Sequence, residues 1–452
     1  MKLTKPLKAV LRLLAALAVL AAVPAAAQPT SLLGQDSVQK VDLLVVVTHA
    51  DDDTAISPYL ARAVLDQGKS AAVLHVGSSS SGFHTFGRER KRGLGLVRQV
   101  EARRALARLG IDQVWFLGGN DVFHYSPLPC LASLEHGRTL EEVVRLVRLT
   151  RPEIVLTWLP NLAVGQNHGG HQAAGVLATE AFDAAGDPTS FPAQLVEDGL
   201  AAWQPKKLYY FTDAFTTDFL AGKGPSYSIM TVSPARGQTY LRLAVEETLA
   251  YRSQYFPWWM ETIQRGNVDE IEKMMLGGDW PFYVEPLRLM RAKSLVGGKL
   301  DGDLFEQIGV EPIASAPLPA AAAEREPAVE IGPPWSFYRR FYRRHSIEPL
   351  AATPPPTLVV PLSKPFAVPI LLRNPGAAEQ IVELSLGPLP AGFTEVPGAR
   401  SFRVPPRTST SIELKVTAPG KASWTPVSLT VDAKEQGRVV LLVAVSDYTT
   451  AP

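Results

Sequence analysis

Two clusters of histidine and aspartate residues follow apolar runs in this 452-residue chain. His49-Ala50-Asp51-Asp52-Asp53 begins two residues after the apolar run 43–47, and His168-Gly169-Gly170-His171 comes after the run 154–158. Two His and one Asp can hold a zinc ion and leave one coordination position open for water. An adjacent second Asp is then available to accept a proton from that water. The residue types and spacing therefore predict a metal-dependent hydrolase.

Each cluster also has a simpler explanation when it is taken alone. The acidic run could cap a helix that starts near residue 55, and Asp53 is the best candidate for that role. A lone His-x-x-His is a weak signal for metal binding. Capping does not account for His49, however, and both clusters lie beyond the ends of expected strands. Together they favour a metal site.

The elements expected between residues 41 and 211 would place these clusters on one edge of a sheet. Short apolar runs alternate there with helical patterns, which predicts an α/β fold with a Rossmann-like, mostly parallel sheet and helices on both faces. Ligands bind such sheets beyond the carboxyl ends of the strands, where His49, Asp121 and His168 are found. Residues 238–292 are expected to add further helix. The expected strands are 43–47, 71–76, 114–117, 154–158 and 208–211, and the expected helices include 58–67, 98–109 and 140–149.

The N-terminus has the pattern of a secretory signal. Lys and Arg residues precede an apolar stretch over 13–23, and Ala25-Ala26-Ala27 follows it. We expect residues 1–27 to be a signal peptide, with cleavage after Ala27, and the mature protein to be periplasmic or secreted. No later segment is long and apolar enough to cross a bilayer, so no transmembrane span is expected in the mature chain.

The composition changes after the expected α/β domain, which we assign to residues 28–312. Residues 313–354 are rich in Ala and Pro and are expected to form a linker, in which case the part before them should fold alone. Within this segment, aromatic residues interleaved with the Arg339–Arg344 cluster predict a short amphipathic helix that docks between domains. Residues 355–452 alternate with a period of two, which predicts an Ig-like β-sandwich with strands near 366–372, 381–386, 411–416, 427–431 and 439–445.

Charge and cysteine content exclude several classes of site. The formal net charge is +1, so the whole chain gives no indication of nucleic-acid binding. Cys130 is the only cysteine, which rules out an internal disulfide and a multi-cysteine zinc site. Histidine and carboxylate side chains remain as the expected metal ligands.

The motifs and their order resemble the PIG-L/LmbE-like N-acetylglucosaminyl deacetylase family. The His49–Asp52 segment is similar to the family's His-Pro-Asp-Asp motif, and the segment from His168 to His171 is similar to its His-Pro-Asp-His motif. The resemblance extends over about residues 41–312 and includes an Arg-x-x-Glu helix at Arg98, a strand followed by Asp121, and a His-x-Ser-Gln signature. In the last of these Tyr251 replaces His, and Ala50 and Gly170 replace a Pro and an Asp in the first two.

The resemblance implies a reaction and a role for each matching residue. His49, Asp52 and His171 would hold Zn²⁺ or another divalent metal, and Asp51 would act as the general base. His168 would stabilise the oxyanion or protonate the leaving amine. Arg98 and Asp121 would contact the substrate, although a helix salt bridge to Glu101 is the structural alternative for Arg98.

The implied function is an exported zinc-dependent deacetylase that hydrolyses the N-acetyl amide of an amino sugar or an N-acetylated glycan. Two alternatives remain open. One is a catalytically idle glycan-binding protein on the same fold, although Asp51 beside the expected ligands argues against it, because binding alone needs no base. The other is a different metal-dependent amidase or esterase.

Overall fold

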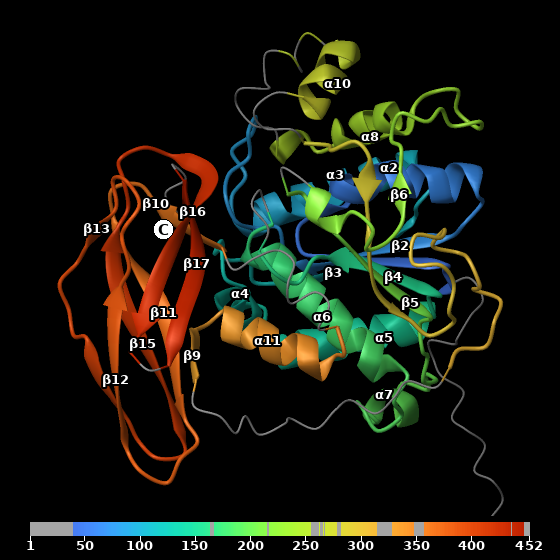
Figure 1. Ribbon diagram of the computed structural model, residues 1–452. Coiled ribbons are helices and arrows are strands. Elements are labelled where there is room, and N and C mark those ends of the chain that lie inside the picture. Colours follow the sequence, from blue (N-terminus) through green and yellow to red (C-terminus); the bar gives the residue numbers. More distant parts are fainter. Residues whose placement is uncertain are drawn as a thin grey trace, which may run out of the picture.

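The computed structural model describes residues 39–162, 167–214, 217–254, 262, 265, 267–277, 282–313, 328–347, 357–434 and 436–446. An α/β domain and a β-sandwich lie side by side, with one helix, α11, between them (Figure 1). The expected signal peptide, and with it Ala27, falls outside these residues. Within them, no helix has the length and apolar character needed to span a membrane.

A six-stranded sheet forms the centre of the α/β domain, with the strand order β3-β2-β1-β4-β5-β8. The first five of these pair in parallel, and β8 is antiparallel at one edge. All residues of β1, β2, β4 and β5 are buried, because helices cover both faces, and this explains their continuous apolar sequences. The bounds are β1 Leu43–Val47, β2 Ala71–Gly77, β3 Gln113–Gly119, β4 Ile154–Trp158, β5 Lys207–Phe211 and β8 Met290–Ser294. The predicted Rossmann-like sheet is confirmed.

Helices pack against both faces of this sheet, as predicted (Figure 1). One face carries α4, α5 and α6, and the other carries α2, α3 and α8. The helix α6 begins at the residue after His168 and contacts β4 and β1. The bounds are α2 Ser57–Ala61, α3 Arg92–Arg108, α4 Pro127–Ser133, α5 His136–Thr150, α6 Gly169–Ala185 and α8 Tyr240–Thr248.

The region expected to be helical over 238–292 is helical only in part. It contains α8 and α10 (Val268–Leu276), but its end forms β7 (Leu287–Arg288), and β8 follows directly. The expectation of helix was wrong there, because β8 hydrogen-bonds to the free edge of β5, and that pairing outweighs the local helical pattern. Trp258 and Trp259 lie outside the described residues.

The C-terminal domain is a β-sandwich of two sheets, as predicted. The first sheet has the order β10-β17-β16-β12-β14 and the second has β13-β15-β11-β9. Inward-facing apolar residues alternate with exposed ones along strands such as β12 and β15, which accounts for the period of two. The bounds are β10 Thr357–Pro361, β11 Pro365–Asn374, β12 Gln380–Leu386, β13 Thr394–Glu395, β14 Ser401–Val404, β15 Thr408–Thr417, β16 Ser423–Ala433 and β17 Gly437–Ser446.

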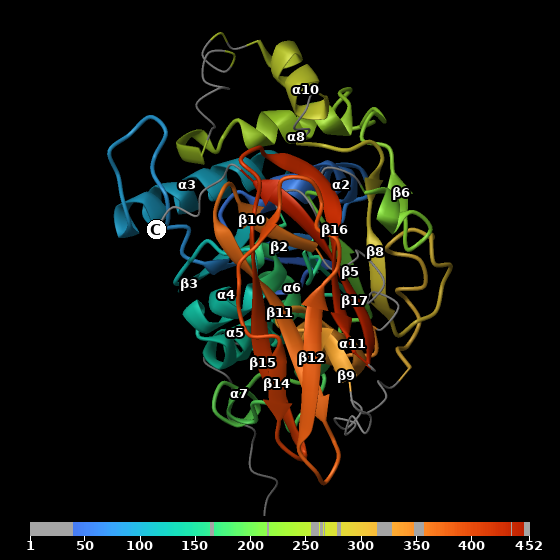
Figure 2. The same ribbon diagram turned by 60° about the vertical axis from the view of Figure 1, so that its left-hand side comes forward.

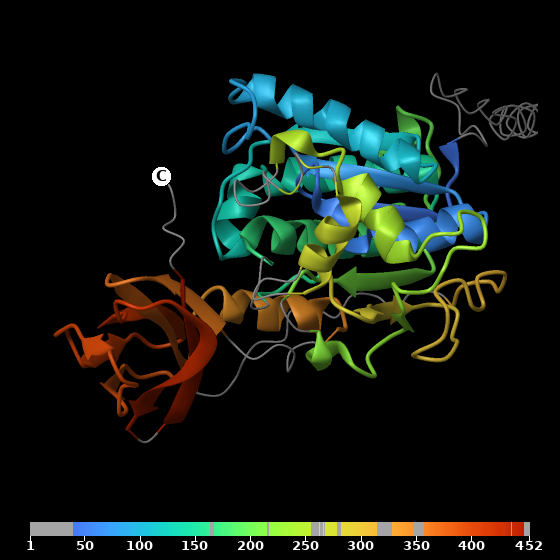
Figure 3. The same ribbon diagram turned by 90° about the horizontal axis from the view of Figure 1, so that it is seen from above.

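Ordered structure occupies part of the segment that we expected to be a linker. The strand β9 (Ala328–Ile331) pairs with β11 of the sandwich, and α11 (Trp335–Arg344) follows it. The predicted amphipathic helix is confirmed, since α11 buries aromatic side chains and leaves arginines at its solvent face. Figure 3 shows α11 extending from the sandwich along the α/β domain, and Figure 2 shows the sandwich in front of that domain. The linker interpretation therefore does not describe residues 328–347.

Candidate metal centre and active site

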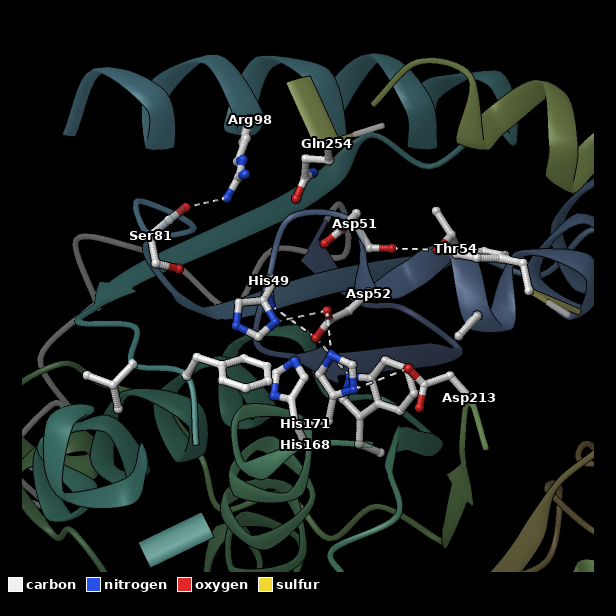
Figure 4. Close-up of a pocket in the computed structure, with 15 residues that line it drawn as sticks. His49, Asp51, Asp52, Thr54, Ser81, Arg98, His168, His171, Asp213 and Gln254 are labelled. Atoms are coloured by element: carbon white, nitrogen blue, oxygen red, sulfur yellow. Dashed lines mark hydrogen bonds and ion pairs between the residues drawn. The ribbon is translucent and has the colours of Figure 1, made fainter. Parts of the chain in front are cut away.

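The two predicted clusters meet beyond the carboxyl ends of β1 and β4, which are neighbours in the sheet. His49, Asp51, Asp52, His168 and His171 all line one pocket with a volume of about 280 Å³ (Figure 4). Parallel pairing of the two strands brings residues 49–52 beside residues 168–171 although more than one hundred positions separate them in sequence. The structure therefore brings these five predicted residues together.

The two oxygens of the Asp52 carboxylate have different partners. Oδ2 accepts hydrogen bonds from the backbone N–H groups of Thr48 and His49, at 2.9 and 3.0 Å, and from Trp158 Nε1 at 2.8 Å. Oδ1 lies 3.1 Å from His49 Nδ1 and 3.2 Å from His171 Nε2. Three N–H donors thus fix the carboxylate through one oxygen and direct the other toward two imidazoles.

The His171 ring is held on two sides. It stacks on the indole of Trp158 with a centroid distance of 4.0 Å and an interplanar angle of 2°. Its Nδ1 lies 3.5 Å from Asp213 Oδ2, and its Nε2 faces Asp52. A carboxylate on the far nitrogen of a histidine favours the proton at that nitrogen and leaves the near nitrogen free to bind a metal.

Backbone geometry determines which nitrogen of His168 carries the proton. His168 is the N-cap of α6, and its Nδ1 accepts a hydrogen bond from the backbone N–H of Gly170 at 3.2 Å. A neutral imidazole that accepts at Nδ1 carries its proton at Nε2, so Nε2 is a donor. This arrangement suits hydrogen-bond donation to a substrate better than metal coordination.

The donor atoms present fit a divalent cation. Ring nitrogens of His49, His168 and His171 lie within 4.8 Å of one another, and Asp52 Oδ1 lies next to two of them. Two imidazoles and one carboxylate oxygen form a ligand set that leaves a coordination position open. Nδ1 of His168 already accepts a hydrogen bond from the backbone N–H of Gly170. The better ligand set is therefore His49, Asp52 and His171.

The pKa values of these buried groups depend strongly on the charges of their neighbours. Burial by itself would raise the pKa of Asp52, but the neighbouring His171 and His49 hold this pKa well below its usual range. Burial would lower the pKa of His171, yet Asp52 and Asp213 raise it to about 10. Burial and the two other imidazoles lower the pKa of His168, which keeps it neutral. Asp52 is therefore ionised between two imidazoles, and a divalent cation bound there would replace the second proton that His171 carries in its absence.

Asp51 is held by a residue from a distant part of the chain. With the Gln254 amide nitrogen facing it, Asp51 accepts hydrogen bonds at 3.0 Å on Oδ2 and 3.2 Å on Oδ1. Gln254 lies on the turn Arg252–Gln254, which Glu101 fixes by accepting from Ser253 N at 2.9 Å and Ser253 Oγ at 2.5 Å. Burial and the charge of Asp52 raise the pKa of Asp51. A raised pKa and a fixed orientation both suit a general base.

Asp53 does not cap a helix, contrary to our expectation. It lies inside the short helical turn Asp52–Ile56, is fully buried, and accepts hydrogen bonds from Tyr251 Oη at 2.8 and 2.7 Å. Burial raises the pKa of Asp53 to about 7. Its partner, Tyr251, is the residue that replaces the family's His, and it is too far away in sequence for a local pattern to reveal the contact.

The two residues predicted to contact substrate have protein partners. Arg98 lines the pocket, but its guanidinium donates to the backbone carbonyls of Ser79, Ser81 and Phe83 in the loop after β2, at 3.0, 3.0 and 3.4 Å. Asp121 accepts from the backbone N–H groups of Ser78 and Ser80, at 3.2 and 3.1 Å. Both side chains thus hold the same loop over the pocket. Because Glu101 bonds to Ser253, the alternative salt bridge to Arg98 does not form.

Among the pocket residues that were not predicted from the sequence are Asp213, Trp158 and Phe123. Asp213 follows β5, as the predicted residues follow their own strands, so the same strand-end criterion would have found it. Trp158 is the last residue of β4, where it appeared to be an ordinary core residue. Phe123 is 48 % exposed, and its ring centroid lies 5.0 Å from that of His168. No sequence pattern distinguishes Phe123 from other surface aromatics.

The family model described as "PIG-L: GlcNAc-PI de-N-acetylase" matches residues 44–182. This chain carries a PIG-L domain. The PIG-L match begins in β1 and ends in α6, so it contains His49, Asp51, Asp52, His168 and His171. The predicted resemblance to a deacetylase family is confirmed.

Several known proteins are similar to the PIG-L part of the chain. A 1D-myo-inositol 2-acetamido-2-deoxy-alpha-D-glucopyranoside deacetylase of Thermobifida fusca (strain YX) is 26% identical over 182 residues, which are 37% of this chain and 60% of the relative. The N,N'-diacetylchitobiose deacetylase of Pyrococcus horikoshii has a TM-score of 0.40 and 18% identity, over 55% of this chain and 84% of that one. The zinc-inhibited form of the teicoplanin deacetylase Orf2 has a TM-score of 0.33 and 14% identity, over 55% and 97%.

Proposed function

We propose that this protein is an exported, zinc-dependent deacetylase that hydrolyses the N-acetyl amide of an amino sugar or an N-acetylated glycan. The observation that supports this most strongly is the asymmetric Asp52 carboxylate. Three N–H donors hold its Oδ2, its Oδ1 faces His49 and His171, and an oriented Asp51 lines the same pocket. A site that only bound glycans would have no need for this combination of ligand set and base.

His49, Asp52 and His171 would hold the zinc ion. When bound, zinc would polarise the amide carbonyl and acidify a water molecule in the pocket. Asp51 would accept a proton from the attacking water while the Gln254 amide keeps its carboxylate oriented. The His168 Nε2–H would donate to the carbonyl oxygen as negative charge develops there. Asp51 would then return the proton to the leaving amine, so that water and the amide give acetate and a free amine.

Export is proposed from the N-terminal sequence. Lys2, Lys5 and Lys8 precede the short apolar stretch, and a run of alanines ends at Ala27. A periplasmic or secreted enzyme would meet glycans of the cell envelope or its surroundings, which agrees with the proposed substrate class. The PIG-L match and the similar deacetylase of Thermobifida fusca support the same substrate class.

The test is acetate release by the purified, zinc-loaded protein. The panel should contain N-acetylglucosamine, N,N'-diacetylchitobiose, longer N-acetylated glycans, a non-sugar acetamide and an O-acetyl ester. We expect acetate from at least one N-acetyl sugar, loss of activity after chelation, and recovery on addition of zinc. Faster release from the ester or the simple acetamide would favour the other hydrolase. Glycan binding without any acetate release would favour the idle binding protein.

A further inference from the structure

The C-terminal half of the chain contacts the active-site loops through the buried side chain of Gln172. This residue follows His171 in α6 and is fully buried. Its Nε2 donates to the backbone carbonyl of Asn167 at 2.7 Å and to that of Tyr125 at 3.0 Å. Its Oε1 accepts a hydrogen bond from the hydroxyl of Tyr338 on α11. One amide therefore joins α11 to two separate loops.

Both loops contact His168. Asn167 immediately precedes it, and the backbone N–H of Gly169, immediately after it, donates to the carbonyl of His124 at 2.6 Å. In the second loop the ring of Phe123 lies against the His168 imidazole, and Tyr125 packs edge-on against Phe123 with a centroid distance of 5.5 Å. The position of His168 therefore depends on how these two loops are held.

The β-sandwich supports the same loops by a second route. Val359 of β10 and Ala444 of β17 form a small apolar cluster with Leu162, and Tyr125 packs against it. Leu162 belongs to the chain after β4, and Tyr125 to the chain after β3. The sandwich thus packs against both segments that flank His168, in agreement with its position beside the α/β domain (Figure 1).

We propose that Tyr338, acting through Gln172, is a positioning residue for His168, so that the C-terminal region is part of the catalytic apparatus. The catalytic consequence rests on the proposed deacetylase function. Tyr338 does not touch the reacting atoms. Its hydroxyl satisfies the buried Oε1 of Gln172 and so orients the Nε2 that holds Asn167 and Tyr125. Without it, a buried acceptor loses its partner and the amide is free to turn.

The chain offers a matched control one helical turn away. Tyr342 is as buried as Tyr338, at 3 % exposure each, and its ring stacks with that of Tyr338 at 6.2 Å. Among the residues that the structure describes, its hydroxyl has no hydrogen-bond partner. Tyr338→Phe and Tyr342→Phe therefore each remove one buried hydroxyl from the same face of α11, but only the first removes a bond to Gln172.

The experiment compares the two full-length, zinc-loaded variants with the wild-type protein. For Tyr338→Phe we expect kcat to fall about tenfold with KM changed less than twofold, because His168 acts on charge that develops only in the transition state. Zinc content should be unchanged, since the contacts of Asp52 and His171 do not involve Gln172. Tyr342→Phe should match the wild type in all three measurements.

A spectroscopic measurement separates this inference from the proposed function. The chain has eight histidines, so ¹⁵N-histidine labelling gives a tractable spectrum in which His168 is assigned with a His168→Asn variant. We expect the His168 ring signals to shift or broaden in Tyr338→Phe and to stay in place in Tyr342→Phe. If the wild type releases no acetate, the proposed function fails and these signals alone decide the inference.

Two results would overturn the inference: unchanged kcat and His168 signals in Tyr338→Phe, or an equal loss in Tyr342→Phe. If Tyr338→Phe does not fold, the Val359→Ala variant tests the inference instead. This substitution weakens the contact between the sandwich and Tyr125 and leaves α11 unchanged. A fall in kcat at constant zinc content would then support the inference. Wild-type kinetics and His168 signals would reject it.

Discussion

The Asp52 carboxylate shows how single side chains set up this site. Its two oxygens differ only in their partners, yet the three N–H donors on Oδ2 leave Oδ1 as the atom that faces both imidazoles. A carboxylate that is fixed in this way binds a cation with little loss of side-chain freedom. The same contacts prevent Asp52 from acting as the base, and that role falls to its neighbour Asp51.

Replacing Asp52 should therefore remove the metal. Asp52→Asn retains the shape of the side chain but loses the negative charge that compensates the cation and the two imidazoles. We expect metal affinity to fall by about 100-fold or more, on the scale found when ligand geometry and charge are disturbed. Metal analysis after gel filtration and calorimetric titration with zinc would measure this. Full zinc occupancy in Asp52→Asn would show that the Asp52 carboxylate is not a metal ligand.

Replacing the proposed general base, Asp51, should lower activity without loss of the metal. Asp51→Asn keeps a hydrogen-bond partner for Gln254 but removes the proton acceptor. We expect kcat to fall by about 10²–10⁴-fold with zinc content and KM close to the wild-type values. Steady-state kinetics with metal analysis on the same preparation would check both parts. A variant with nearly normal kcat would show that another group accepts the proton.

At the scale of elements, the N-terminus of α6 brings His168 and His171 toward β1. The first residues of α6 are glycines because side chains would collide with their surroundings. A Cβ on Gly169 would lie 2.2 Å from the carbonyl oxygen of Ser126, and one on Gly170 would lie 2.9 Å from Cε1 of His49 and 3.1 Å from Cε1 of His168. Gly170 stands where the related family motif has Asp. Here its lack of a side chain makes room for the two imidazoles.

The Gly170→Ala substitution should lower the catalytic rate without lowering the thermal stability of the protein. Alanine is favoured over glycine in a helix by about 1 kcal/mol, but the contact of the new Cβ with His49 Cε1 at 2.9 Å opposes this gain, so the melting temperature should hold rather than rise. The new Cβ would displace the His49 and His168 rings by a few tenths of an ångström, and we expect kcat to fall about tenfold.

The matched control is Gly137→Ala in α5, where an added Cβ meets nothing within 4 Å. It should gain stability without any change in activity. Thermal unfolding and steady-state kinetics on both variants provide the comparison. Equal kinetics in the two would show that the space at Gly170 is not needed.

At the scale of the whole molecule, the α/β domain and the sandwich share one hydrophobic core. Apolar residues of β1 and β4 belong to the same continuous cluster as the buried face of α11 and the inner residues of the sandwich. His345, which follows α11, and Lys293 of β8 both bind Asp183 of α6, at 2.7 and 2.5 Å. A linker would make no such contacts.

We therefore expect the α/β part not to fold well alone, which reverses the sequence-based expectation. A chain that ends at residue 312 loses α11 and exposes the apolar surface that Trp335, Tyr338 and Phe341 cover. We expect aggregation or a strongly lowered melting temperature. Gel filtration and thermal unfolding would measure this, with the full chain as control. A monodisperse truncated protein that melts at the same temperature as the full chain would contradict the shared core.

Export gives a prediction about the mature chain. Cleavage after Ala27 would leave Gln28 as the first residue when the full sequence is expressed in a bacterial host with a periplasm. Intact-mass analysis and N-terminal sequencing of the periplasmic fraction would show this. Recovery of the uncleaved chain in the cytoplasm alone would contradict both the signal and the location.

The sequence by itself determined the layered fold and most of the site. Strands such as β1 and β4 are buried on both faces, so their whole sequences are apolar and their ends are easy to place. Because His49 and His168 follow strands of one parallel sheet, the sequence also predicted that they would meet. These inferences succeed because they depend on local patterns and on a general rule of sheet topology.

Only the tertiary structure decided which partners these residues have. Asp53 was expected to cap a helix and instead binds Tyr251, which lies 198 positions away. Gln254 holds Asp51, and Tyr338 reaches Gln172, over comparable separations. Such contacts leave no periodicity in the sequence, because they arise where surfaces from distant segments pack together and each buried polar group must find a partner.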